Sequence, residues 1–104
     1  MNIFKQLFGG SEPADLAVLI KEGAFLVDVR SPGEFSGGHV KGSVNIPLDT
    51  VGAQLSKFKN KKHIIVFCQS GNRSGQAKSI LERNGLTNVV NGGTWNQVNK
   101  FIDK

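Results

Sequence analysis

The stretch HIIVFCQSGNRS, residues 63–74, predicts the fold class of this 104-residue chain. Its first half is a run of β-branched and aromatic residues that predicts a strand over His63–Cys68. An apolar run without alternating polar side chains is typical of a strand buried on both faces of a parallel sheet. The polar half leads through Gly71 into a predicted helix over Ser74–Asn84, which Gly85 ends. This order of strand, short loop and helix favours an α/β fold.

The segments on either side continue the alternation of strands and helices. Short apolar runs predict further strands at Ala24–Val29, Val44–Pro47 and Asn88–Asn91. Apolar residues at helical spacing predict helices from the N-cap Ser11 to Gly23, over Leu48–Lys59 and from Trp95 to Ile102. We therefore expect one α/β domain over residues 1–104, a parallel sheet with helices on both faces, and residues 1–10 as a frayed segment packed on it.

The composition excludes several classes of protein. Hydrophobic residues make up 38% of the chain and charged residues only 20%, which argues against a disordered chain. The single cysteine, Cys68, excludes an internal disulfide and a cysteine-rich zinc or iron–sulfur site, and we expect no metal and no cofactor. No run of 18 apolar residues is present, and residues 1–10 are too polar for a signal peptide. We therefore expect a cytoplasmic protein without membrane contact.

The formal net charge of +5 favours anionic partners. Part of the positive charge lies in the segment KFKNKKH, residues 57–63, which has four lysines and one aromatic residue. The segment lacks an RNA-binding signature and a basic helix long enough to enter a nucleic-acid groove. It is better explained as a solvated loop before a buried strand, so we expect small anions as partners and no nucleic acid.

Cys68 is the candidate nucleophile. It ends the most apolar strand, and ligands gather where the carboxyl ends of parallel strands meet the following loops. Loop N–H groups, a helix N-terminus and the Arg73 guanidinium would favour its thiolate. A cysteine kept for packing is the alternative, but it would lie inside the apolar run. The loop is expected to bind the anionic part of a substrate through Gln69, Ser70, Gly71, Asn72, Arg73 and Ser74.

A second polar cluster follows the strand that ends near residue 29. Asp28 is predicted to have a supporting role, in which it accepts N–H groups of neighbouring loops or pairs with an arginine. Arg30 is predicted either to bond to Glu34 and fix the turn, or to contact the substrate anion. His39 is assigned to a turn, and His63 opens its strand at the end opposite the cysteine, so neither histidine is a catalytic candidate.

Three segments of the chain resemble single-domain rhodaneses, the thiosulfate-type sulfurtransferases. They are DVRSPGEFSGGHVKGSVNIPL from Asp28 to Leu48, IIVFCQSGNRS from Ile64 to Ser74, and VVNGGTWNQ around Gly92, Gly93 and Trp95. Together with the preceding helix they cover nearly the whole chain. The resemblance implies five mostly parallel strands with helices on both sides, and a catalytic cysteine that accepts a sulfur atom to become a persulfide.

The spacing between Cys68 and Arg73 separates this chain from its relatives in fold. Dual-specificity phosphatases and related arsenate reductases hold a tetrahedral oxyanion with C-x5-R, whereas four residues separate the cysteine and the arginine here. The shorter loop leaves less room for a phosphate, and no aspartic acid can be assigned to protonate a leaving alkoxide. A phosphatase or arsenate reductase is therefore the less favoured alternative.

The resemblance implies a sulfurtransferase with a ping-pong mechanism. It would move a sulfane sulfur from thiosulfate or a similar small anionic donor to cyanide, a thiol or a cysteine of a partner protein, through a persulfide on Cys68. The charge of Arg73 favours thiosulfate over 3-mercaptopyruvate, and the uncharged Gln69 and Ser70 leave that choice open. A persulfide relay or binding module with little turnover of small donors is the alternative. With no second cysteine, release of the sulfur has to be intermolecular.

Overall fold

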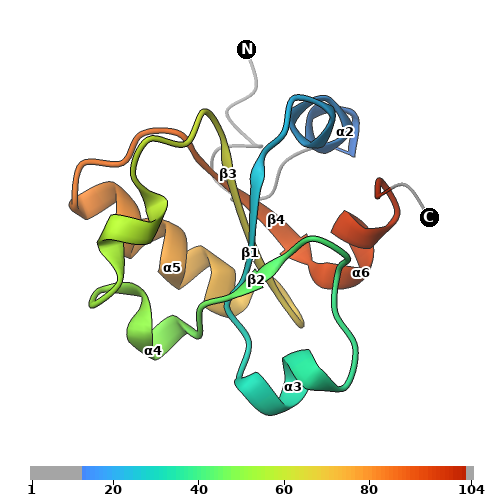
Figure 1. Cartoon of the computed structure of the whole chain (residues 1–104), viewed down its shortest axis with the longest axis horizontal. Coiled ribbons are helices and arrows are strands. Elements are labelled where there is room, and N and C mark those ends of the chain that lie inside the picture. Colours follow the sequence, from blue (N-terminus) through green and yellow to red (C-terminus); the bar gives the residue numbers. More distant parts are fainter. Residues whose placement is uncertain (1–12, 103–104) are drawn as a thin grey trace.

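Four parallel strands form the centre of the molecule (Figure 1). They are β1 (Phe25–Asp28), β2 (Val44–Asn45), β3 (Ile64–Cys68) and β4 (Val89–Thr94), in the spatial order β2-β1-β3-β4. The structure is a computed structural model that describes residues 13–102, so the predicted N-cap Ser11 and the frayed segment at residues 1–10 lie outside it. The predicted parallel α/β sheet is confirmed; within the described range it has four strands and not the five that the resemblance implied.

Strand β3 lies between β1 and β4, and all five of its residues are buried. This position explains its unbroken apolar sequence. The pairing with β4 shifts by one residue between Val66 and Phe67, at the level of Gly92. A Cβ atom at Gly92 would lie 2.8 Å from Ile65 Cγ2 and 2.9 Å from Val98 Cγ2. Only glycine therefore allows β4 to approach β3 and α6 this closely.

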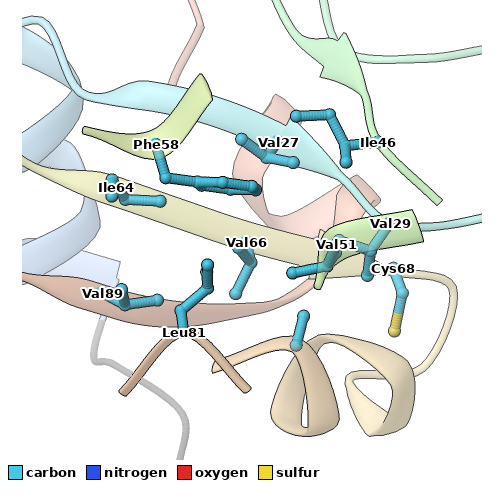
Figure 2. Packing of buried hydrophobic residues seen from close by; sticks show 11 residues of the cluster. Val27, Val29, Ile46, Val51, Phe58, Ile64, Val66, Cys68, Leu81 and Val89 are labelled. Atoms are coloured by element: carbon cyan, nitrogen blue, oxygen red, sulfur yellow. The ribbon is translucent and has the colours of Figure 1, made fainter. Parts of the chain in front are cut away.

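Helices cover both faces of the sheet, as Figure 1 shows. Helices α4 (Leu48–Val51) and α5 (Asn72–Arg83) lie on one face, while α2 (Pro13–Lys21) and α6 (Trp95–Asn99) lie on the other. A buried cluster fills each interface. The first, drawn in Figure 2, contains Val27, Val29, Ile46, Val51, Phe58, Ile64, Val66, Cys68, Ala77, Leu81 and Val89. The second contains Leu16, Leu26, Val40, Ile65, Phe67 and Val98.

The predicted helix over Leu48–Lys59 is wrong in its middle. The structure has α4 and a separate 3-10 helix, η1 (Leu55–Phe58), and α4 ends where the N–H of Gly52 donates to the carbonyl of Thr50. Val51 and Phe58, on either side of the break, are both fully buried in the same cluster. Gly52 stands at the break, and glycine is a poor residue for the interior of a helix, which the spacing of the apolar residues did not take into account.

The helix α3 (Pro32–Ser36) is not predicted by the pattern of apolar residues. It is held by a capping box, in which Ser31 Oγ accepts the N–H of Glu34 and the N–H of Ser31 donates to the Glu34 carboxylate at 3.1 Å. The sequence S-x-x-E carries this signal, and the short helix buries no side chain that would add a second one.

The remaining helices and strands differ from the predictions at their ends. Helix α5 begins at Asn72, two residues before the predicted start, and α6 ends at Asn99. Strand β2 stops at Asn45, two residues before Pro47, which has no N–H to continue the ladder, whereas β4 extends to Thr94. Among residues 13–102, no helix has the length and apolar content needed to cross a bilayer.

Candidate active site

Cys68 is the last residue of β3, and its sulfur points toward the beginning of α5 (Figure 2). The N–H of Gly71 donates to Sγ at 3.0 Å, and the N–H of Ser74 donates to it at 3.4 Å. The hydroxyl of Ser74 lies 3.5 Å from the sulfur. The loop and the first turn of α5 therefore present hydrogen-bond donors to the cysteine, as the sequence predicts.

The surroundings of Cys68 act on its pKa in opposite directions. Burial raises the pKa of the thiol, because the side chain has no exposed surface. Hydrogen bonds from the Ser74 side chain and from the backbones of Ser74, Ser70 and Gly71 lower it, and the net pKa lies below its ordinary value. The thiolate is therefore favoured mainly by short-range donors of the loop.

The loop depends on a left-handed residue and on one buried amide. Gly71 has φ of 95°, a left-handed backbone conformation that residues other than glycine rarely adopt. Asn91 of β4 lies behind the loop: its Oδ1 is 2.7 Å from Ser74 Oγ and accepts the N–H of Gly93 at 2.9 Å. Sequence reasoning missed Asn91, although a polar residue inside an apolar strand was an available signal.

The Arg73 guanidinium forms a bidentate ion pair with Glu34. Its Nη1 and Nη2 donate to the two carboxylate oxygens of Glu34, at 2.7 and 2.9 Å. This bond lowers the pKa of Glu34 to about 2, with a further contribution from the backbone of Ser31, and it raises the pKa of Arg73. The extra cation predicted beside the thiolate is thus bound to a carboxylate from the other loop.

Asp28 and Arg30 form a separate, buried ion pair. Asp28 accepts the backbone N–H of Arg30 at 2.9 Å, and its two oxygens accept Nε and Nη2 at 2.7–3.0 Å. Asp28 therefore makes both kinds of contact expected of it, a pair with an arginine and a bond from a loop N–H, and its supporting role stays a prediction. The predicted bond from Arg30 to Glu34 is wrong, because the Arg30 guanidinium binds the carboxylate of Asp28, only two residues away.

Trp95 connects the pair to the cysteine loop. The Arg30 guanidinium lies over the indole ring, 4.7 Å from its centroid, and Nη2 also donates to the carbonyl of Gly38. The indole N–H of Trp95 donates to Oε1 of Gln69, the residue after Cys68, at 3.2 Å. Gln69, Ser70 and Asn72 are exposed, so the bond from Trp95 links α6 directly to the exposed part of the loop.

The two histidines lie away from the sulfur. His39 stacks on the ring of Phe35, with Nδ1 2.8 Å from the Phe35 carbonyl oxygen, which agrees with its assignment to a turn. His63 precedes β3 and its Nε2 lies 2.7 Å from Glu22 Oε1. Neither contact brings an imidazole to Cys68.

A cleft of about 550 Å³ adjoins the site between α4 and α5. Its walls are largely apolar, and Arg73, Gln76 and Ile80 of α5 face it together with Ser31 of the β1–α3 connection. A volume of this size is typical of sites for small organic molecules. The cleft therefore offers room beside the loop for more than a single anion.

Residues 12–96 match the family described as the rhodanese-like domain. The chain belongs to this family. Its sequence is 41% identical over 69 residues to the thiosulfate sulfurtransferase PspE of Escherichia coli, which covers 64% of this chain and 66% of that protein. It is also 41% identical over 68 residues to YqhL of Bacillus subtilis, an uncharacterized protein, covering 65% of this chain and 54% of YqhL.

The fold of this rhodanese-like chain also matches solved structures. The human single-domain sulfurtransferase superposes with a TM-score of 0.74 at 26% identity, over 91% of this chain and 98% of that one. The recognised family and the parallel α/β sheet agree with the expectations from the sequence. The matched stretch spans between about half and two thirds of the length of these two curated relatives.

Proposed function

We propose that this rhodanese-like chain acts as one unit, a sulfurtransferase that carries a sulfane sulfur on Cys68. The observation that supports this most strongly is the pair of N–H donors, from Gly71 and Ser74, that meet at the cysteine sulfur. Membership of the family and relatives named as sulfurtransferases support the reaction class. Thiosulfate is the proposed donor, because one of those relatives is named for it.

In the first half of the reaction, the Cys68 thiolate attacks the outer sulfur of thiosulfate. A new S–S bond forms at Sγ, the S–S bond of the donor breaks, and sulfite leaves with the electron pair. The terminal sulfur of the persulfide then carries the negative charge. The loop N–H groups from Ser70 to Ser74 are proposed to stabilise that charge, since backbone donors fixed in advance need no reorganisation during the reaction.

In the second half, a thiophilic acceptor attacks the outer sulfur of the persulfide. Cyanide leaves as thiocyanate, a thiolate leaves as a new persulfide, and in both cases the S–S bond at Cys68 breaks and returns the thiolate. A cysteine of a partner protein or a small thiol is the proposed natural acceptor. The apolar cleft beside Arg73 supports an acceptor with an organic body. We propose that this exchange takes place in the cytoplasm.

Access to the sulfur requires the loop to open. The Cys68 side chain has no exposed surface, whereas Gln69 and Ser70 directly after it are exposed. Few contacts hold these two residues, and segments of this kind open locally at low cost in free energy. A donor is therefore proposed to reach the sulfur by displacing Gln69 and Ser70.

The test is the intact-protein mass after brief incubation with thiosulfate without reducing agent. We expect a gain of about 32 Da, one sulfur atom, that cyanide removes as thiocyanate and that is absent in Cys68→Ser. Turnover that survives in Cys68→Ser would contradict the proposal.

A second arm separates the alternatives. A mass gain without steady-state formation of thiocyanate would favour the persulfide relay over the enzyme. Hydrolysis of an aryl phosphate, lost in Cys68→Ser, would favour the phosphatase instead. A variant with one residue added to the Cys68–Arg73 loop is the matched control, since a wider ring of N–H groups should admit a phosphate more easily.

A further inference from the structure

The rim of the candidate site carries no free positive charge. The charged side chains of residues 28–38 and 68–74 are two arginines and two carboxylates, so these two loops are neutral before the thiolate is counted. Both arginines are paired: Arg30 with Asp28 at 2.7 Å, and Arg73 with Glu34 at 2.7 and 2.9 Å. A dianionic donor therefore approaches a thiolate without an unpaired guanidinium in either loop to attract it.

The two pairs differ in how firmly each arginine is held. The side chains of Arg30 and Asp28 are 4% and 0% exposed, and Arg30 also bonds to Gly38 and stacks on Trp95. The side chains of Arg73 and Glu34 are 35% and 36% exposed. Of the two arginines, Arg73 is thus the one whose guanidinium a solvent-borne anion can reach.

Glu34 is held ready to occupy that guanidinium. Its Oε1 accepts the N–H of Ser31 at 3.1 Å and the hydroxyl of Ser31 at 3.0 Å, within the capping box of α3. Both oxygens then bind Arg73, and a bidentate contact of this kind is among the stronger polar contacts in proteins. Any anion that uses Arg73 has to compete with a carboxylate that is already in place.

We propose that Glu34 is a specificity-determining residue, which weakens the binding of dianionic sulfur donors by occupying Arg73 and so favours donors of lower charge. The inference rests on the proposed sulfurtransferase function and concerns how tightly this chain binds thiosulfate relative to donors of lower charge. A free guanidinium attracts a dianion about twice as strongly as a monoanion, because the interaction scales with the product of the charges. Glu34 cancels that preference because it occupies the guanidinium.

The test compares thiosulfate with methanethiosulfonate at one ionic strength, with cyanide as acceptor. Both transfer their outer sulfur, and they leave as sulfite and methanesulfinate, so they differ by one unit of charge. In Glu34→Gln we expect KM for thiosulfate to fall about fivefold, KM for methanethiosulfonate to fall about twofold, and kcat for both to stay within about twofold of wild type. Glutamine keeps the acceptor that the capping box needs.

Two further variants locate the effect. Glu22→Gln removes the same charge next to His63 and Lys62, at the other end of β3, and should leave both KM values unchanged. In an Arg73→Gln background, Glu34→Gln should no longer change the ratio of the two KM values, because it acts through Arg73. An unchanged ratio in Glu34→Gln alone, or an equal loss of kcat with both donors, would overturn the inference and leave Glu34 as a support for the loop.

Sulfur transfer by the wild-type protein shows whether a failure concerns the role of Glu34 alone or the proposed function as well. If wild type transfers sulfur from both donors and the ratio does not respond to Glu34→Gln, only the inference fails. If wild type transfers sulfur from neither donor and gains no mass, the proposed function fails and the inference fails with it.

Discussion

The loop after β1 and the loop after β3 leave the same edge of the sheet, but they are held in different ways. The first is fixed by its own side chains, through the buried Asp28–Arg30 pair and the capping box of Ser31 and Glu34. The second turns its N–H groups toward Cys68, and side chains from other segments of the chain hold it in place. Its outside partners are Glu34, Asn91 and Trp95. The first loop thus serves as a scaffold, and the second keeps its own donors available for a charged sulfur.

The largest effect should come from breaking the scaffold with Asp28→Asn. The change leaves the Arg30 side chain, 4% exposed, without a counter-charge, and loss of one partner of a buried pair costs about 3–5 kcal/mol of stability. Urea unfolding should show a lower midpoint with the same m-value. Asp49→Asn, on the exposed side of α4, is the matched control and should change stability by less than about 0.5 kcal/mol. Equal effects would show that the pair is not structural.

A smaller loss of stability and a specific chemical effect are expected from Ser74→Ala in the second loop. The substitution removes the hydroxyl that contacts Sγ and Asn91, which costs about 1 kcal/mol. Because hydrogen bonds from Ser74 lower the pKa of Cys68, that pKa should rise. The pH dependence of alkylation by iodoacetamide, followed by intact mass, measures this shift. Ser70→Ala keeps its backbone donor and should leave the pKa of Cys68 in place, so equal midpoints for the two variants would contradict the prediction.

Trp95→Phe tests the tie between the two loops. It removes the N–H donor to Gln69 and keeps an aromatic ring beside Arg30, so the stability should fall by no more than about 1 kcal/mol. Since Cys68 is fully buried, its alkylation reports opening of the loop and should become faster. Gln69→Ala should have the same effect, and the double variant should add nothing to either single one. Additive effects would mean that Trp95 acts through another contact.

The smallest effect concerns the exposed Glu34–Arg73 link in acid. The folded pKa of Glu34, about 2, lies below its ordinary value of 4.5, so the pair stabilises the fold fully above pH 4.5 and loses that contribution as pH falls toward 2. Urea midpoints across this range should fall less steeply for Glu34→Gln than for wild type. Parallel curves for the two proteins would indicate that the link adds nothing to stability, as many surface pairs do.

Most of the fold could be predicted from local sequence signals. The buried β3, the parallel sheet with helices on both faces, and the position of Cys68 at a strand end follow from apolar runs and from residues next to one another. The errors lie in the short helices. Leu48–Lys59 has apolar residues at helical spacing throughout, yet α4 ends at Val51, and the next residue, Gly52, disfavours a helix interior. Helix α3 was not predicted, because its capping box is present in the sequence but no apolar residues at helical spacing accompany it.

The sequence by itself determined the candidate nucleophile and the loop that surrounds it, because the last residue of one strand and the six residues after it contain both. Only the tertiary structure decided which carboxylate each arginine binds. Arg30 has Asp28 two residues away and Glu34 four residues away, and Arg73 lies 39 residues from Glu34. Ion pairing depends on distance in space, and the parallel pairing of β1 with β3 brings the two loops together at one edge of the sheet. The charge at the candidate site is therefore set by the fold and not by the loop sequence alone.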